Sequence, residues 1–548
     1  MSTKITLGVK GMTCDSCEHH VGSVLASAGL TDLEVDWRRG LATGIDTGSF
    51  DVTKATDALE GTTYEIVSVS TSDNEPADIT ASGDDDYDLL IIGSGSAAFA
   101  AAIKARDLGA SVAIAEKGTI GGTCVNVGCV PSKALLRPAE LYHQAGHSPF
   151  AGVATFAGDL DLGVLIAAKD ELVGVLRQEK YVDLLDVYDI DLIRGTARFT
   201  GPNAVEVDGR PITAGRYLIA TGASPWVPPI EGLDDTDYLT STTALELTEL
   251  PEELIVVGAN AIGLELGQLF AHLGSKVTWV EALDRIAPFE EPEISDLLRG
   301  NLVSDGGQVY ENAVARRAGT DGDRTWLEIE TGGTGARLEA DRLLIATGRR
   351  ANTANLGLDF ADVGTDKHGS IVVDASFATS NPAVWAAGDV TTIPQFVYVA
   401  AASGNIAAEN ALRAAGRAID LRTMPRVTFT SPPIASVGLT EEAARETGRP
   451  VVTSILPLDS VPRALVNRDT AGVIKLVADE STGELLGAHM LAEGAGDVIQ
   501  AAVVAMHYHA TVDEIAGMFH PYLTMAEALK LAAQTFNKDV RNLSCCAA

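Results

Sequence analysis

One pattern occurs twice in this 548-residue chain and limits the folds that it can adopt. In each copy an apolar strand runs into a glycine-rich turn, as in DLLIIGSGSAA and ELIVVGANAIG, and a helical segment follows. An acidic residue ends the next strand, Glu116 after Gly93 and Glu281 after Gly258, 23 positions on in both copies (93 to 116 and 258 to 281). Small residues let backbone amides at a helix start approach a pyrophosphate, and the acid can hydrogen-bond a ribose. The pattern predicts two dinucleotide-binding units rather than two bare packing turns.

The two turns share small residues at the motif positions, with one exception. These positions are Gly93, Gly95 and Ala98 in the first turn and Gly258, Asn260 and Gly263 in the second. Two dinucleotide sites in one chain imply electron transfer between two cofactors, and a nicotinamide nucleotide with a flavin is the expected pair. The acid Glu281 would repel a 2′-phosphate, so it favours NADH over NADPH.

All six cysteines fall into three close pairs. Cys124 and Cys129 lie in GGTCVNVGCVPSK, shortly after the first glycine turn, and Lys133 ends this motif. A disulfide here can accept electrons from a reduced flavin, and a local helix start would lower the pKa of a thiol. The alternative, a pair of buried structural cysteines, leaves the flanking glycines and the lysine unexplained. The pair is predicted to be redox-active.

The remaining segments divide the chain by their hydrophobic period. KITLGVKG, CEHHVGSVLASAG, LEVDW, LATGIDTG, DVTKATDALEG and YEIVSVS predict a small ferredoxin-like βαββαβ domain, and the polar segment after it predicts a flexible acidic linker. LLIATGRR echoes YLIATGAS, which indicates that the chain leaves one Rossmann-like domain, builds a second and returns. Beyond about Met424, alternating strands such as GVIKLVAD predict a final α+β domain. The expected fold class is α/β, with ranges 1–70, 71–86, 87–235 with 346–423, 236–345, and 424–548.

From Tyr87 to about Lys530 the chain resembles the flavin disulfide reductases, the family of dihydrolipoyl dehydrogenase and glutathione reductase. The cysteine motif, both glycine turns and AAGD at 386–389 carry this resemblance. It implies an FAD-binding domain at 87–235 and 346–423, an NAD(P)H-binding domain at 236–345 and a dimerisation domain at 424–548. The FAD contacts that it implies are Ala98, Glu116, Gly118, Thr123, Lys133, Ala223, Asp389 and Val397.

The same resemblance implies roles around the cysteine pair. Cys129 would face the flavin, and Cys124 would exchange with substrate. Lys133 would pair with Glu265 of the GLE segment beside the flavin, for which an ordinary surface ion pair is the alternative.

One departure from this family lies in PYLTMAEAL at 521–529, which resembles the family's C-terminal H-P-T-x-x-E segment. Aligning T-M-A-E with T-x-x-E puts Tyr522 at the catalytic histidine position, while His520 stands two residues early. A disulfide reductase needs that imidazole to protonate a leaving thiolate, whereas a metal ion has no such leaving group. Tyr522 therefore argues against a disulfide substrate.

A second departure is the cysteine doublet Cys545 and Cys546 near the end of the chain. Adjacent thiols can capture a soft cation, although a doublet alone is also compatible with incidental exposed cysteines. With Tyr522 it resembles the mercuric ion reductases, in which C-terminal thiols of one subunit deliver Hg(II), free or thiol-bound, to the inner pair of the other. This implies a two-fold homodimer and gives Tyr181 an active-site role, with simple packing as the alternative.

The third pair, Cys14 and Cys17 in GMTCDSCEHH, resembles the metal-binding motif of heavy-metal-associated domains. Metal binding is favoured here over a redox or structural pair. His19 and His20 are expected to be ordinary helix residues. His507 and His509 have no cysteine or carboxylate at a metal-binding spacing.

The formal charge of −35, without any run of Lys or Arg, argues against nucleic-acid binding and suits either a well-solvated surface or salt adaptation. No secretory h-region or bilayer-length apolar stretch is present, so cytoplasmic location is expected. Two rival interpretations remain. One is a dihydrolipoyl dehydrogenase-like reductase with a metal-binding appendage, favoured by VEALDRIAP, and the other is a metal-sequestering protein with a vestigial reductase body, which the intact flavin motifs oppose.

Overall fold

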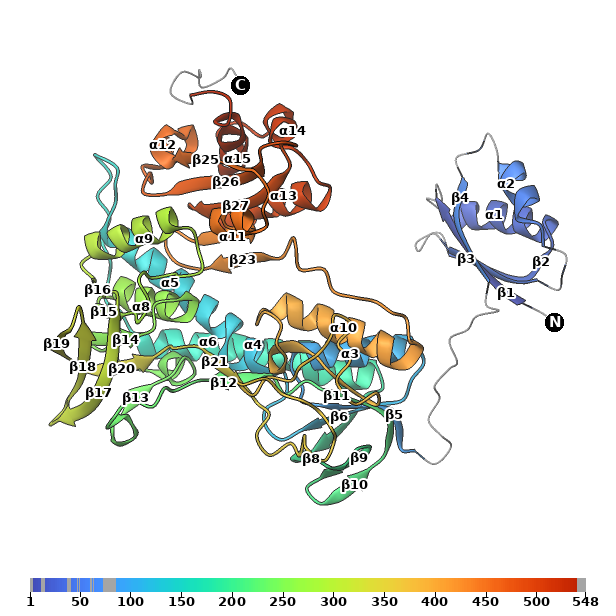
Figure 1. Ribbon diagram of the computed structural model, residues 1–548, viewed down its shortest axis with the longest axis horizontal. Coiled ribbons are helices and arrows are strands. Elements are labelled where there is room, and N and C mark those ends of the chain that lie inside the picture. Colours follow the sequence, from blue (N-terminus) through green and yellow to red (C-terminus); the bar gives the residue numbers. More distant parts are fainter. Residues whose placement is uncertain are drawn as a thin grey trace. The chain divides into compact units, whose positions relative to one another are not determined.

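The computed structural model describes residues 3–10, 15–36, 41–46, 48, 50–59, 62, 64–71 and 85–539. The chain forms two compact units, the smaller built on the residues up to Thr80 and the larger on Ala81–Ala411 and Gly416–Ala548 (Figure 1). Most of the expected linker, 72–84, lies outside the described residues.

The smaller unit has the predicted βαββαβ order and a four-stranded antiparallel sheet in the order β2-β3-β1-β4. Apolar residues of both layers, among them Leu7 on the sheet and Leu25 on a helix, are fully buried between them. This confirms the ferredoxin-like prediction. Its elements are β1 (Thr3–Lys10), α1 (Asp15–Ser27), β2 (Leu30–Asp36), β3 (Leu41–Asp46), α2 (Val52–Leu59) and β4 (Glu65–Thr71).

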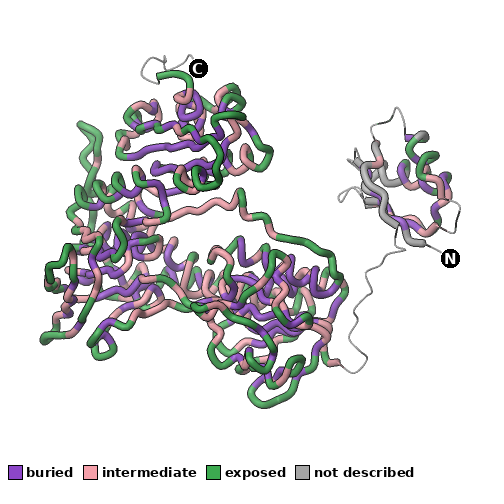
Figure 2. Tube along the Cα trace, viewed as in Figure 1, coloured by how far each residue is buried: buried purple, intermediate pink, exposed green. Residues whose placement is uncertain are grey.

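The larger unit opens with a five-stranded parallel sheet in the order β22-β11-β5-β6-β7. The apolar end of β5 is buried at four consecutive positions, as expected for a strand covered on both faces (Figure 2). The strands are β5 (Tyr87–Ile92), β6 (Val112–Glu116), β7 (Asp191–Arg194), β11 (Ala214–Ile219) and β22 (Val384–Ala386). Its helices are α3 (Ser96–Asp107), α4 (Gly122–Val127), α5 (Cys129–Gly146), α6 (Leu162–Arg177), α7 (Asp183–Val187) and α10 (Val397–Arg413).

A second parallel sheet, in the order β13-β20-β14-β15-β16, is built from the residues between β11 and β22. Because β22 then pairs with β11, the chain leaves the first sheet and returns to it, as the repeated ATG segments predict. The strands are β13 (Tyr238–Leu239), β14 (Glu253–Val257), β15 (Lys276–Val280), β16 (Gln308–Tyr310) and β20 (Arg342–Ile345), with helices α8 (Ala261–Leu273) and α9 (Pro292–Ser304). Smaller sheets are β8 (Ala197–Gly201), β9 (Ala204–Val207) and β10 (Arg210–Ile212); β12 (Ala223–Pro225) and β21 (Arg349–Ala351); and β17 (Ala313–Asp321), β18 (Arg324–Thr331) and β19 (Thr334–Ala340).

The C-terminal part forms an antiparallel sheet in the order β23-β24-β27-β26-β25, packed with helices, as the predicted α+β domain requires. The strands are β23 (Pro425–Thr428), β24 (Ile434–Gly438), β25 (Val451–Pro457), β26 (Val473–Asp479) and β27 (Leu485–Leu491). The helices are α11 (Glu441–Glu446), α12 (Pro462–Asn467), α13 (Ala495–His507), α14 (Val512–Gly517) and α15 (Met525–Gln534). In the described parts of the chain, no helix is long and apolar enough to cross a bilayer.

Helices α5 and α8 matter most for the site, because they share one apolar core. Leu135 and Ala139 of α5 belong to the same buried cluster as Leu266 and Phe270 of α8. The helix that begins at Cys129 therefore packs on the helix that begins in the second glycine turn.

Candidate functional site

The cysteine pair lies where α4 ends and α5 begins. Cys124 is on α4 and Cys129 is the first residue of α5, with Gly128 between the two helices. Gly122 has a φ of +66°, and a Cβ there would lie 2.5 Å from the Cα of Gly95. The glycines before the pair therefore allow the cysteine segment to rest directly on the first glycine turn.

Both cysteines are free thiols, and their ionisation differs. A hydrogen bond from the Cys124 thiol, assisted by the charge of Lys133, lowers the pKa of Cys129 to about 7, against the opposing effect of burial. The same hydrogen bond and burial raise the pKa of Cys124. The helix start at Cys129 was expected from the sequence and is confirmed; the positive end of the α5 dipole also favours a thiolate.

Lys133 and Glu265 form the predicted ion pair, with 2.6 Å between Lys133 Nζ and Glu265 Oε2. It is no surface pair, because Glu265 is only 7% exposed. The other carboxylate oxygen accepts the backbone N–H of Phe429 at 2.9 Å, and Lys133 Nζ lies 4.5 Å from the centre of the Phe429 ring. The pair joins α5 to α8 one turn from Cys129.

The first glycine turn has the shape that a dinucleotide needs. Gly93 has a φ of +105°, and a Cβ there would lie 2.4 Å from the carbonyl oxygen of Ala220. Glu116 accepts a hydrogen bond from Ser94 Oγ at 2.6 Å and one from the N–H of Gly118 at 2.6 Å. Ala98 is fully buried on α3.

Arg349, on β21, is a residue of this region that the sequence reasoning missed. Its guanidinium donates to the carbonyl of Ala223 and, at 3.3 Å, to the hydroxyl of Thr123. Burial lowers the pKa of Arg349 and raises that of Asp389, and the charge of Arg349 opposes the second shift. The buried Nε of Arg349 has no hydrogen-bond partner among the described residues. A buried cation with an unpaired donor fits a site that receives an anionic or carbonyl-bearing group.

Three predicted flavin contacts thus gather around Arg349: Thr123, Ala223 and Asp389. Val397 begins the 17-residue helix α10 and is partly exposed. The signal for Arg349 was present in the ATGRR segment, but its partners are distant in sequence and only the fold brings them together.

The second glycine turn repeats the first. Gly258 has a φ of +98°, and a Cβ at Gly263 would lie 1.8 Å from the carbonyl oxygen of Gly258. Asn260 has an ordinary φ of −106°, so the missing glycine introduces no backbone strain. The carboxylate of Glu281, 7% exposed, accepts backbone N–H groups of Ala259 at 2.8 Å and Leu283 at 2.9 Å.

The two predicted active-site tyrosines lie in different places. Tyr181, within the π-helical segment Gln178–Val182, makes an edge contact with Phe99 at 4.9 Å. Burial raises its pKa, a hydrogen bond with Ser96 opposes this shift, and the charges of Cys124 and Cys129 raise the pKa further. A Cβ at Gly121, three residues before Cys124, would lie 3.4 Å from the Tyr181 ring, so this ring lies against the segment that leads to the pair. Tyr522 is half-exposed just before α15, in a different part of the unit from α4 (Figure 1).

The other predicted metal-binding cysteines are largely outside the described residues. Cys17 lies in the first turn of α1, while Cys14, Cys545 and Cys546 fall outside the described part of the chain. Of the histidines set aside earlier, His509 Nδ1 lies 2.6 Å from a Glu484 oxygen and His520 Nδ1 lies 3.2 Å from the carbonyl of Met518.

Comparisons with known proteins agree with this geometry. The family model for pyridine nucleotide-disulphide oxidoreductases matches residues 87–404, and the model for the dimerisation domain of that family matches 424–533. A mercuric reductase of Lysinibacillus sphaericus is 48% identical over 99% of this chain and 100% of its own. One of Streptomyces lividans is 54% identical over 84% of this chain and 98% of its own. The HOCl-induced flavoprotein disulfide reductase RclA from Escherichia coli, solved as a Cu(II) complex, superposes with a TM-score of 0.74 at 32% identity, covering 82% of this chain and 99% of that one.

Proposed function

Because this chain belongs to the pyridine nucleotide-disulphide oxidoreductase family and, within it, to the mercuric reductases, we propose that it reduces Hg(II) to Hg(0) with electrons from NAD(P)H. The balanced reaction is NAD(P)H + Hg²⁺ → NAD(P)⁺ + H⁺ + Hg(0). FAD, when bound, supplies the two-electron carrier between the nucleotide and the cysteine side of the site. We assign FAD to residues 87–235 and 346–423 and NAD(P)H to 236–345.

The observation that carries this proposal is the ionisation of the inner pair. Cys129 has a pKa of about 7, so a large share of it is thiolate at neutral pH. Thiolates are the preferred ligands of soft cations. Cys124 and Cys129, which lie at the junction of α4 and α5, can hold one such ion between them. Cys124 and Cys129 then release their thiol protons and bind Hg(II) as thiolates. When the ion has been reduced and Hg(0) leaves, both residues are thiols or thiolates again.

The residues around the pair support this chemistry. Lys133, held by the buried Glu265, keeps a positive charge near Cys129 and so stabilises its thiolate. Tyr181, whose ring lies against Gly121 shortly before the pair, would assist exchange of ligands on Hg(II). Tyr522 replaces the histidine that a disulfide substrate would need, which disfavours lipoamide-like substrates.

For delivery of the ion, we propose a route along the other two cysteine pairs. Cys14 and Cys17 collect Hg(II), and Cys545 and Cys546 of one subunit pass it to Cys124 and Cys129 of the other. The match to a dimerisation domain supports the two-fold homodimer that this route requires.

For the electron donor, we propose NADH rather than NADPH. The buried carboxylate of Glu281 is fixed by two backbone N–H groups and cannot turn away from the end of β15. A 2′-phosphate close to this charge would be repelled.

An anaerobic assay of NAD(P)H oxidation by the holoenzyme tests the proposal. We expect oxidation that depends on Hg(II), that is lost in Cys124→Ala and Cys129→Ala, and that has a higher kcat/KM with NADH. His509→Gln, at a surface histidine that contacts Glu484, serves as the control outside the three cysteine pairs. Turnover with lipoamide but not with Hg(II) would overturn the proposal, and a strong preference for NADPH would overturn the assignment of the donor.

A further inference from the structure

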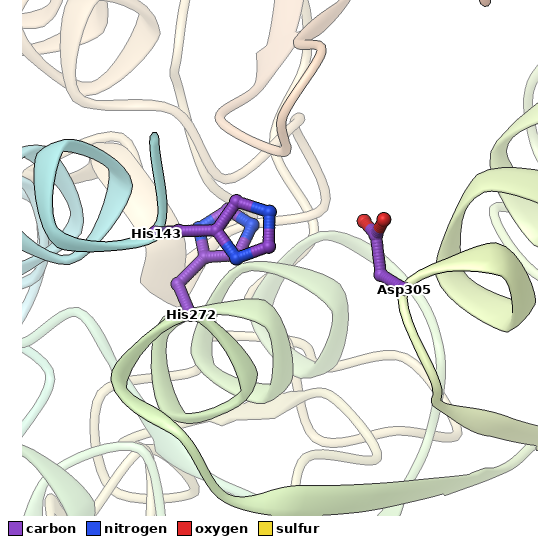
Figure 3. A group of neighbouring side chains, drawn as sticks. All are labelled: His143, His272 and Asp305. Atoms are coloured by element: carbon purple, nitrogen blue, oxygen red, sulfur yellow. The ribbon is translucent and has the colours of Figure 1, made fainter. Parts of the chain in front are cut away.

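Three side chains meet at the C-terminal ends of three helices in the larger unit. His143 lies in the last turn of α5, His272 lies in the last turn of α8, and Asp305 caps the end of α9. The nitrogen and oxygen atoms that they offer all lie within 4.8 Å of one another. Figure 3 shows the two imidazole rings stacked, with the Asp305 carboxylate to one side of them.

The two imidazoles are available to bind a ligand. Among the described residues, neither ring of His143 and His272 has a hydrogen-bond partner, although His272 is only 7% exposed. The rings stack at 4.4 Å, and His147, one turn after His143, stacks on His143 at 4.2 Å. A neutral imidazole offers a nitrogen lone pair to a metal ion.

The helix ends add an electrostatic reason for a cation. Each helix C-terminus carries a partial negative charge, and three of them converge here. Asp305 at the end of α9 adds a full negative charge at a place where the α9 dipole is unfavourable for negative charge. A bound cation would remove this conflict, whereas a simple stack of neutral histidines would not.

We propose that His143, His272 and Asp305 form a binding site for a divalent transition-metal ion that accepts imidazole and carboxylate ligands, such as Zn(II). Two histidines and one carboxylate leave further coordination positions for water. The exposed Asp305 gives the ion a path from solvent.

The ion would act as a structural brace. Helix α5 begins at Cys129, and α8 begins directly after the second glycine turn. The pair of Lys133 and Glu265 already joins these helices nearer their starts. A metal bound at their far ends would fix the second point of contact and tie in α9, without touching the reacting cysteines.

Zinc titration of the full-length holoenzyme, with Zn(II) alone as the probe, tests the site. The cysteine pairs also bind Zn(II), but they are unchanged in every variant, so their contribution cancels in the comparison. We expect His272→Gln and Asp305→Asn each to bind one Zn(II) per chain fewer than the wild type, and to lose the part of the Zn(II)-dependent rise in Tm that this ion supplies. His509→Gln, whose side chain contacts Glu484 elsewhere, should match the wild type.

Asp305 is exposed, so Asp305→Asn is the informative variant if His272→Gln does not fold. Equal Zn(II) stoichiometry in the wild type and Asp305→Asn would overturn the three-ligand site. Full binding by His272→Gln in a folded protein would overturn it as well.

Discussion

At the scale of single residues, the reactive thiol is Cys129. Its lowered pKa depends first on the hydrogen bond from Cys124, then on the charge of Lys133. In the reduced enzyme, alkylation of Cys129 by iodoacetamide should rise with pH through about 7, because the thiolate, which reacts, is present above that pH and protonated below it. Cys124→Ala removes the hydrogen bond and should move this inflection upwards. Mass spectrometry of the Cys129 peptide follows the rate at each pH.

Lys133→Gln is the matching test of the charge and should also raise the inflection. Glu265 then loses its partner, so far-UV circular dichroism is needed to show that the variant is folded. An inflection in Cys124→Ala that stays where the wild type has it would contradict the assigned cause of the shift.

Residues inside short motifs were predictable, whereas residues that meet across the fold were not. Cys124 and Cys129 follow from the motif GGTCVNVGCVPSK, and the two acids that end the second strands of their units follow from their spacing to the glycine turns. Arg349 meets Thr123 only because β21 pairs with β12, which lies more than 120 residues earlier in the chain. His143, His272 and Asp305 come from three separate helices, and no local pattern in the sequence joins them.

At the scale of secondary-structure elements, β26 shows what a sequence pattern misses. The segment GVIKLVAD predicts a strand that contains one lysine; the strand is confirmed, and all seven of its residues, the lysine included, are buried. Lys475, 2% exposed, faces three carboxylates: Glu291 and Glu293 at the start of α9 and Glu441 at the start of α11, each at 2.9 Å. Lys475 therefore forms a buried ionic junction between β26, α9 and α11 and is not solvated.

This junction gives a stability prediction. Lys475→Met leaves Glu291, itself 2% exposed, as a buried charge without its cation. Removing one partner of a buried pair costs about 3–5 kcal/mol, so we expect a clearly lower Tm. Arg316→Met is the control, because the Arg316 pair with Glu330 is on the surface, where such pairs contribute about 0–1 kcal/mol. Differential scanning calorimetry measures both Tm values, and equal Tm values for the two variants would contradict a stabilising role of the junction.

At the scale of the whole molecule, the C-terminal domain presents apolar side chains that a single chain does not cover. Phe519 is fully exposed, and Met518 and Tyr522 are about half-exposed, in the segment between α14 and α15. Such clustered exposure indicates an interaction surface, and the family match names this region a dimerisation domain. Tyr522 can then serve a site that its own chain does not form.

If two subunits share each site, inactive chains should complement each other. A chain with Cys124→Ala and Cys129→Ala keeps its C-terminal thiols, and a chain with Cys545→Ala and Cys546→Ala keeps its inner pair. Random reassociation of equal amounts makes half of the dimers mixed, each with one complete site, so about a quarter of wild-type Hg(II)-dependent NADH oxidation should return. The two parents, treated in the same way but unmixed, are the controls. Activity of the mixture no higher than the mean of its parents would show that the C-terminal thiols do not act between subunits.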